Sequence, residues 1–318
     1  DMLIQLPDQL IHITRMHPDI LLTSAKTGYG LDKLLQKRSE PAPLATKEIT
    51  LPEYAEHEVG MIPQLAARFE TAAQLPGAEY LAKLRYLILP IREADAVPQP
   101  LRCKTLLELP RAAFGTVEPD TMRRLAALEG SDFAGVIANN LAQFGYASPL
   151  PVFGGLGLNV TNPMSAAEYV CLGACGLLVQ PETALTAMRA VAPRQKDGTP
   201  VPTAALCYGH LPLMLTRACP LRNVRTSCAG CTHKGKLRDR KGRDFPVRCS
   251  APGSAGMRTV FNPVPLYMGD RLTEMPVDLA VAAFTLEPAD RVEEVLTRLF
   301  HQQPFDGEFT RGLYYTNN

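Results

Sequence analysis

The chain has 318 residues, of which 46% are hydrophobic and 20% charged, and its net charge is +1. This composition is ordinary for a globular protein. No apolar run reaches the ~18–20 residues of a membrane-spanning helix, so we expect no membrane contact. Eight irregularly spaced cysteines in a chain of this length exclude a small secreted disulfide scaffold and favour a reducing, cytoplasmic setting.

The first hundred residues precede the regular part of the sequence. Residues 1–50 are predicted to be an appendage that ends in the Pro/Ala-rich linker SEPAPLATKE. Within residues 51–101, apolar residues at helical spacing predict a helix over 52–76, and LRYLILP at Leu84–Pro90 predicts a buried strand. Because the chain opens with Asp1 rather than Met, we expect a fragment whose missing N-terminal part is a further partner of the site.

Predicted strands and helices alternate from residue 102 to residue 318, which favours a parallel α/β architecture. We count about seven strand–helix units, and no Gly-rich dinucleotide fingerprint follows the first strand, so we predict a TIM-barrel-like (β/α) fold with outer helices. The predicted strands are Cys103–Leu109, Phe133–Ala138, Val152–Val160, Gly176–Val179, Ala204–Tyr208 and Asp278–Phe284, with a strand or hairpin at Thr259–Phe261 and Leu266–Met268; the predicted helices are Pro119–Leu128, Ser165–Leu172, Pro181–Val191 and Ala289–Phe300.

In such a barrel, the chemistry lies at the carboxyl ends of the strands, where seven polar residues fall. Three of our four catalytic candidates also have a simple structural explanation: Asn159 shapes a turn, Glu182 begins a helix and His210 fills the core. The catalytic candidates are Asn159, Glu182, Tyr208 and His210, and the other residues at strand ends are Glu108, Asn139 and Arg217.

A cysteine-rich insertion, predicted over residues 217–256, follows the strand that ends at Tyr208. Its four cysteines have the spacing C-x8-C-x2-C-x17-C. A C-x2-C pair turns two sulfurs toward one point, and two more cysteines complete a tetrahedral set of thiolates. This set suits a 4Fe–4S cluster, and a structural Zn ion is the alternative. The predicted ligands are Cys219, Cys228, Cys231 and Cys249, with Cys207 as a substitute for one of them.

The same insertion is strongly basic. Between Arg217 and Arg248 there are ten Lys or Arg and two acids, a local net charge of +8 in a chain whose total is +1. This predicts an anion-binding face that contacts nucleic acid, and a solvated loop is the alternative. We expect Arg217 and Arg248 to lie near the thiolates instead. The predicted nucleic-acid contacts are Arg222, Arg225, Lys234, Lys236, Arg238, Arg240, Lys241 and Arg243.

The strings YGHLPLMLTRACPL, LRDRKGRDFPV, NPVPLYMGDRL and FTRGLYY, together with the cysteine cluster, resemble the C-terminal part of the peptidase U32 family. The resemblance covers roughly residues 100–318 and is closest to long members that carry an inserted domain. Two features depart from the family: His210 stands where its members usually have Arg, and the signature cysteine motif of the short members is absent.

The resemblance implies three hypotheses about function. U32 proteins are known as collagenase-like peptidases, but members are also associated with hydroxylation of RNA bases and of ubiquinone precursors, and several carry a four-cysteine iron–sulfur cluster. The first hypothesis is therefore an iron–sulfur enzyme that hydroxylates a base of ribosomal or transfer RNA. The alternatives are a U32-type peptidase, for which no Ser-His-Asp order is visible, and a non-catalytic zinc-ribbon module that binds RNA.

Overall fold

The computed structural model describes residues 56–146, 148–221, 228–229, 231–250 and 256–316. Contacts divide the chain into residues 1–50 and 51–318, and the description below concerns the second unit. The predicted appendage lies outside the described residues, as do Arg222 and Arg225 of the basic segment. No helix in the described ranges has the length and apolar character needed to cross a bilayer.

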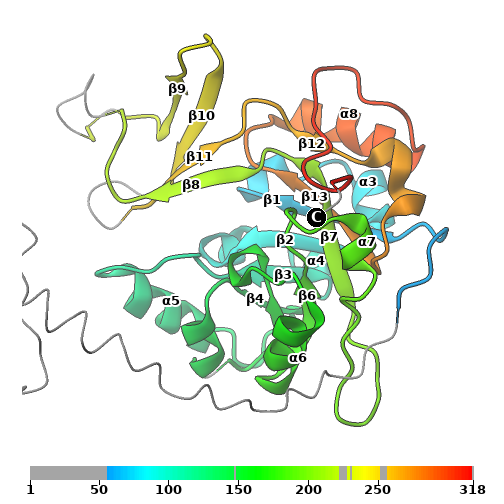
Figure 1. The fold of residues 1–318 in the computed structure, drawn as a ribbon. Coiled ribbons are helices and arrows are strands. Elements are labelled where there is room, and N and C mark those ends of the chain that lie inside the picture. The colour runs from blue at the N-terminus through cyan, green and yellow to red at the C-terminus, as the bar shows by residue number, and fades with distance from the viewer. Residues whose placement is uncertain (1–55, 147, 222–227, 230, 251–255, 317–318) are drawn as a thin grey trace, which may run out of the picture. The chain divides into compact units, whose positions relative to one another are not determined.

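Eight parallel strands form a closed barrel, which confirms the predicted TIM-barrel-like fold (Figure 1). Each strand pairs in parallel with the next, β13 pairs with β1 and β7, and the pairing of β6 with β7 closes the ring. A short antiparallel strand, β12 (Leu266–Tyr267), extends the end of β7. The barrel strands are β1 (Gln64–Phe69), β2 (Tyr86–Pro90), β3 (Thr105–Glu108), β4 (Gly135–Ala138), β5 (Val152–Gly154), β6 (Ala174–Leu178), β7 (Thr203–Gly209) and β13 (Leu279–Phe284).

The prediction of a helix over 52–76 is wrong, because this stretch supplies the first barrel strand, β1. Leu65, Ala66, Ala67 and Phe69 are all buried, so both faces of the strand are covered. A strand buried on both faces is a continuous apolar run, and an Ala-rich run of this kind also matches helical spacing. Pairing with β2 and β13 therefore overrides local helix propensity.

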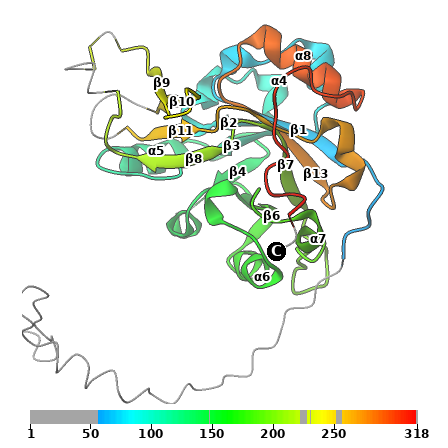
Figure 2. The same cartoon turned by 45° about the horizontal axis from the view of Figure 1, so that its top comes forward.

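Helices cover the outside of the barrel (Figures 1 and 2). α8 has the predicted bounds, whereas the helix predicted over Pro181–Val191 shrinks to α7 and the strand predicted over Val152–Val160 ends at Gly154, before a 3-10 turn. The α-helices are α3 (Ala78–Lys83), α4 (Gln99–Arg102), α5 (Val117–Ala126), α6 (Pro163–Cys171), α7 (Leu185–Met188) and α8 (Ala289–Phe300); the 3-10 helices are Ala72–Gln74, Ile91–Ala96, Leu141–Gly145, Leu156–Leu158 and Gly269–Glu274.

A second sheet of four antiparallel strands projects from the carboxyl end of β7, as predicted for the insertion (Figure 1). We call it the small sheet. Its order is β8-β11-β10-β9, so β11 and β12 lie in different sheets and the hairpin alternative for these two segments is wrong. The strands are β8 (Pro212–Thr216), β9 (Lys234–Arg238), β10 (Asp244–Cys249) and β11 (Arg258–Phe261).

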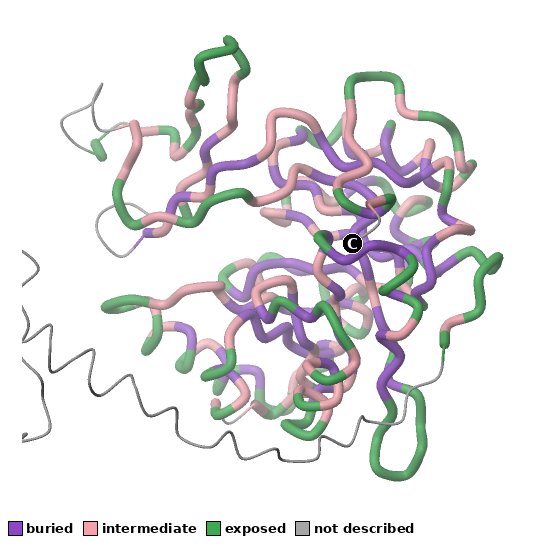
Figure 3. The backbone as a smooth tube through the Cα atoms, in the orientation of Figure 1, coloured by how far each residue is buried: buried purple, intermediate pink, exposed green. Residues whose placement is uncertain are grey.

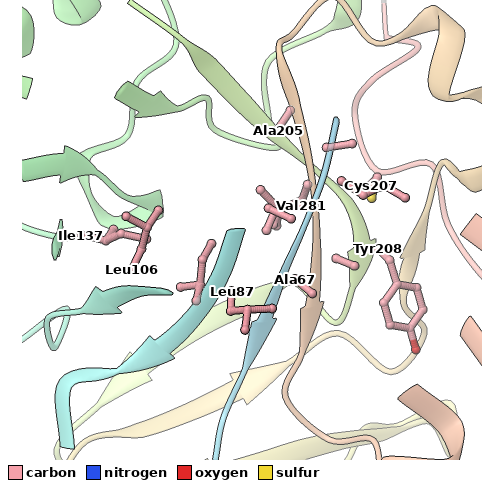
Figure 4. Packing of buried hydrophobic residues seen from close by; sticks show 14 of the residues in the cluster. Ala67, Leu87, Leu106, Ile137, Ala205, Cys207, Tyr208 and Val281 are labelled. Atoms are coloured by element: carbon pink, nitrogen blue, oxygen red, sulfur yellow. The ribbon is translucent and has the colours of Figure 1, made fainter. Parts of the chain in front are cut away.

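The core lies in the barrel and between the barrel and its helices, and Figure 4 shows Leu87, Leu106, Ile137 and Val281 among its members. A register shift occurs between β7 and β13, where Leu206 faces Val281 but Tyr208 faces Ala282. A bulge of this kind re-aims the side chains that follow it.

Candidate active site at the barrel mouth

The cavity occupies the barrel interior and its carboxyl-end mouth, and has a volume of about 1000 Å³. Its wall continues from the strands onto the loop between β3 and α5 and onto one face of the small sheet. Small residues, including Ala66, Ala204 and Ala283, line the interior beside the larger Ile88, Leu106, Ile137 and Val281. Bulky branched side chains fill the usual TIM barrel, and the small residues here leave room for a ligand.

A partly buried network of ions crosses the mouth from β1 to β3. Arg68 Nε donates to Glu108 Oε2 at 3.0 Å, and Arg68 Nη1 donates to Glu70 Oε2 at 2.7 Å. Burial alone would lower the pKa of Arg68, but the two carboxylates outweigh it and raise that pKa. Burial likewise opposes the charge on Glu70, yet Arg68 and Arg92 hold the pKa of this carboxyl below its ordinary value. Arg68 and Glu70 are therefore charged, and hydrogen bonds from Arg68 hold both carboxyl groups in place.

Asn139, at the end of β4, joins this network to the neighbouring loop. Its Nδ2 donates to the Leu109 carbonyl at 2.9 Å and to Glu108 Oε1 at 3.3 Å, while its Oδ1 accepts from the Gly157 N–H at 3.1 Å. A Cβ on Gly157 would lie 2.1 Å from the Asn139 carbonyl oxygen, so only glycine permits this approach. The structure thus positions Asn139 as a rigid amide beside Glu108.

A second polar cluster, contributed by β7 and the segment after β13, faces the first. Glu287 is buried; its Oε2 accepts from the Thr285 and Leu286 N–H groups, and its Oε1 accepts from the Tyr208 hydroxyl at 2.8 Å. His210 Nδ1 lies 2.7 Å from the Asn262 carbonyl, so Nδ1 carries a proton, and His210 Nε2 lies 3.9 Å from Glu287. The other ring nitrogen, Nε2, thus lies on the side of Glu287.

Tyr208 and His210 have different roles in this cluster because of the bulge in β7. Tyr208 is buried among the rings of Tyr267, Phe284 and Phe305 and does not line the cavity. Burial, and then the Glu287 carboxylate, raise the pKa of the Tyr208 hydroxyl, so it remains a hydrogen-bond donor. His210 does line the cavity. The geometry makes Tyr208 a positioning residue and leaves His210 as the group able to reach a ligand.

Three guanidiniums line the cavity without a side-chain hydrogen bond or ion pair to any described residue: Arg85, which lies over the Tyr86 ring, Arg111, after β3, and Arg248, on β10. Burial lowers the pKa of Arg111, and the charge of Glu108 partly opposes this. Burial also lowers the pKa of Arg248, and Glu70 and Glu287 oppose it. Arg248 therefore lies near the carboxylates of the mouth, whereas Arg217 stacks over the Phe114 ring at 4.6 Å.

The other two catalytic candidates lie away from the cavity wall. Asn159 is exposed in a left-handed turn with φ of 53°, and its Oδ1 accepts from Gln180 Nε2 at 2.6 Å. Glu182 is exposed after β6. The structure brings Tyr208 and His210 together through Glu287 but does not bring Asn159 or Glu182 to them.

The four predicted metal ligands form no disulfide, and their segments meet at one end of the small sheet. Cys249 ends β10 opposite Arg258, which lies opposite Thr216 at the end of β8, and Cys249 N donates to the His233 carbonyl just before β9. In the described ranges, no three His, Cys, Asp or Glu side chains converge closely enough to hold a metal ion. The cysteines as placed therefore do not form a preorganised metal site. Cys207 lies apart, fully buried in β7, where burial raises the pKa of its thiol.

The described basic residues of the insertion are exposed on β9 and the β9–β10 turn. Lys236 and Arg238 both pair with Asp244, at 2.5 and 2.7 Å, and Arg243 pairs with Glu308 at 2.8 Å. Residues opposite each other in an antiparallel pair project to the same face, and here Lys234 lies opposite Arg248 and Lys236 opposite Pro246. The basic side chains of β9 therefore share the face on which Arg248 reaches the cavity. The exposed basic residues of β9 and of the β9–β10 turn are Lys234, Lys236, Arg238, Arg240, Lys241 and Arg243.

Several residues of the mouth escape sequence analysis. Arg68 and Glu70 lie in the stretch predicted to be helical, so no strand end is expected there. Glu287 follows the end of β13 by three residues and becomes part of the site only because the chain turns back. Glu108 and Asn139 do fall at predicted strand ends, and this signal is sufficient to find them.

Comparisons with known proteins give similarity of fold only. No family model and no curated protein matches the chain. The chain is similar to the solved structure of the U32 peptidase Mk0906 at a TM-score of 0.40 and 11% identity, over 78% of this chain and 100% of that one. It is also similar to the spore cortex-lytic enzymes SleL of Bacillus megaterium QM B1551 and of Bacillus cereus, both at 10% identity, with TM-scores of 0.30 and 0.33. The matches cover 82% of this chain and 76% of the first SleL, and 87% and 85% with the second.

The first of these proteins carries the name of the family that the sequence resembles. At these TM-scores and identities, the likenesses carry no argument about the activity of this chain. The relation to the U32 family therefore rests on the resemblance of the sequence. The structure adds that the chain forms a closed barrel.

Proposed function

We propose that this protein is a U32-type enzyme that binds RNA and hydroxylates one of its bases at the barrel mouth. The observation that supports this proposal is the continuity between β9 and the cavity. Lys234, Lys236 and Arg238 share a face with Arg248, and Arg248 lines the cavity. A basic track that ends at an open barrel suits a polyanion of which one unit is drawn into a pocket.

The residues of the mouth suit the binding and orientation of a polar base. Asn139 and Glu108 offer an amide and a carboxylate to a base edge, and both are held by hydrogen bonds. His210 Nε2 is the group that accepts a proton, because Nδ1 already donates to the Asn262 carbonyl. Hydroxylation replaces a C–H bond with C–OH and removes two electrons from the base, so the oxygen donor is a second substrate.

The proposal includes a 4Fe–4S cluster on Cys219, Cys228, Cys231 and Cys249. It is supported by the donor set, since four cysteines that form no disulfide are carried by segments that meet at one end of the small sheet. When bound, such a cluster supplies one-electron transfer. Anaerobic purification should give about four irons per chain and a brown protein. Cys228→Ser should lose iron, while Cys103→Ser, at an exposed cysteine outside the insertion, should keep it. Stoichiometric zinc without iron would replace the cluster by a structural zinc site.

RNA binding at several salt concentrations tests the polyanion part of the proposal. The double variant Lys236→Glu with Lys241→Glu should bind single-stranded RNA more weakly. The log–log salt slope of the wild type, near about −3 for about four phosphates neutralised, should become shallower. The control, Lys83→Glu with Lys196→Glu, makes the same charge change at exposed sites outside the small sheet and should bind like wild type. Equal binding and slope in both variants would show that the basic strand is only a solvated surface.

The hydroxylation itself is tested by mass spectrometry of nucleosides from cellular RNA. Cells with the intact gene should contain a nucleoside with one additional oxygen atom, and cells without it should lack that nucleoside. His210→Ala should abolish the product, while RNA binding should persist because the basic face of β9 is intact. An unchanged nucleoside profile on deletion of the gene would refute the proposed reaction.

A further inference from the structure

Arg111 and Arg248 approach the cavity from different parts of the fold. Arg111 follows β3 in the wall of the barrel, and Arg248 lies on β10 of the small sheet above the mouth. Both side chains are partly buried and line the same cavity. Neither makes a side-chain hydrogen bond or ion pair with a described residue. A guanidinium that is removed from water without a partner is costly, so such groups normally face a ligand or a carboxylate.

The carboxylates of the mouth do not fill this role, because each is already bonded to another group. Glu70 is held by Arg68 and Arg92, Glu108 by Arg68 and Asn139, and Glu287 by Tyr208 and two backbone N–H groups. The side chains of Arg111 and Arg248 thus line the cavity with donors that none of these carboxylates accepts from. Arg is the residue best suited to bidentate recognition of an oxyanion, and phosphate in particular.

We propose that Arg111 and Arg248 form an oxyanion clamp that holds one phosphate group of the substrate across the barrel mouth. This inference rests on the proposed function only for the carrier of the phosphate, which would be the nucleotide whose base enters the barrel. The pairing of β9 with β10 supports a nucleotide as the carrier of the phosphate. Lys234 lies opposite Arg248, and Lys236 is two residues, or ~7 Å, further along the same face of β9. The clamp then lies where the basic face of β9 reaches the cavity, at Arg248.

Calorimetric titration with inorganic phosphate at constant ionic strength tests the clamp in the whole protein. Arg111→Gln and Arg248→Gln should each weaken phosphate binding by about ten- to hundredfold, as expected for loss of a charge-assisted hydrogen-bonding partner. Arg240→Gln, at an exposed arginine in the β9–β10 turn, is the matched control and should bind phosphate like wild type. Arg111→Lys and Arg248→Lys keep the charge and should show an intermediate loss, which also covers the case in which a Gln variant fails to fold.

Three further measurements decide the interpretation. A titration with acetate distinguishes phosphate from carboxylate recognition, and tighter binding of acetate than of phosphate would overturn the proposal. Unchanged phosphate affinity in both Arg variants, with altered thermal stability alone, would make the two residues counter-ions of the carboxylates and would also overturn it. Phosphate binding that depends on both arginines, in a protein that does not bind RNA, would retain the clamp while refuting the proposed RNA substrate.

Discussion

The barrel and the small sheet differ in how far their side chains are buried. The barrel strands are buried on both faces, and their side chains form the hydrophobic core. Strands β8 and β9 of the small sheet contain no buried residue (Figure 3). Leu213 and Met214 of β8 are more than half exposed. The barrel therefore supplies most of the free energy of folding, while β8 and β9 of the small sheet present their side chains to solvent. In this protein the candidate site lies where the two meet.

The same comparison applies to charges. Ions inside the barrel mouth are held in a fixed network, as Arg68, Glu70 and Glu108 are. Ions on the small sheet are exposed pairs, as Lys236 and Asp244 are. Water and salt screen the second kind much more than the first. The following variants test this contrast in pairs, one in each region.

The largest effect should come from the partly buried ion network of the barrel mouth. Arg68→Met leaves Glu108 and Glu70 without their shared cation and should lower the free energy of unfolding by about 4 kcal/mol. Lys236→Met removes one cation from Asp244 on the small sheet and should leave stability nearly unchanged. Urea denaturation of both variants measures the difference, and equal losses would contradict the contrast.

Truncation of a leucine in each region should give the next largest difference. Leu87 in β2 is completely buried, so Leu87→Ala should cost about 3 kcal/mol, from lost burial and the cavity left behind. Leu213 in β8 is 55% exposed, and Leu213→Ala should change the free energy of unfolding by less than about 0.5 kcal/mol. A large loss for Leu213→Ala in thermal unfolding would mean that the small sheet contributes to the core.

Two glycines that are crowded for different reasons give a smaller contrast. In Gly157→Ala the new Cβ meets the Asn139 backbone carbonyl, which cannot move aside, so we expect a loss of about 2 kcal/mol. In Gly235→Ala of β9 the new Cβ meets only the side-chain end of Leu221, which can rotate away. Thermal unfolding should show the Gly157 variant clearly less stable than the Gly235 variant, and the reverse order would argue against the close packing of Asn139.

The smallest effect should appear in the pH dependence of stability. Burial opposes the charge on Glu70, but Arg68 and Arg92 hold its folded-state pKa below the ordinary value of 4.5, so its contribution is present above pH 4.5 and is lost as pH falls through the folded pKa. Glu70→Gln should therefore flatten the loss of stability on acidification. Hydrogen bonds from Arg238 and Lys236 also lower the pKa of Asp244, but this group is exposed. At high salt, Asp244→Asn should leave the acid profile of the wild type unchanged.

The sequence by itself determined the barrel from β3 onward. Short apolar runs typical of buried strands alternate there with apolar residues at helical spacing, and this alternation indicates a parallel α/β fold. It also located Glu108, Asn139 and His210 at the ends of strands, since parallel strands place their carboxyl ends at one rim. The insertion, its place after β7 and its charge are equally visible in the sequence. These are local properties, and each depends on residues close together along the chain.

Only the tertiary structure decided which of these residues meet. β1 is a strand because β2 and β13 cover it, although its own residues fit a helix. Asn159 and Glu182 follow strands as His210 does, but their side chains face solvent. Glu287 reaches Tyr208 across 79 residues, and Arg248 reaches the mouth only because the small sheet lies over it. Such contacts depend on strand register and on a bulge in β7, which no local pattern in the sequence encodes.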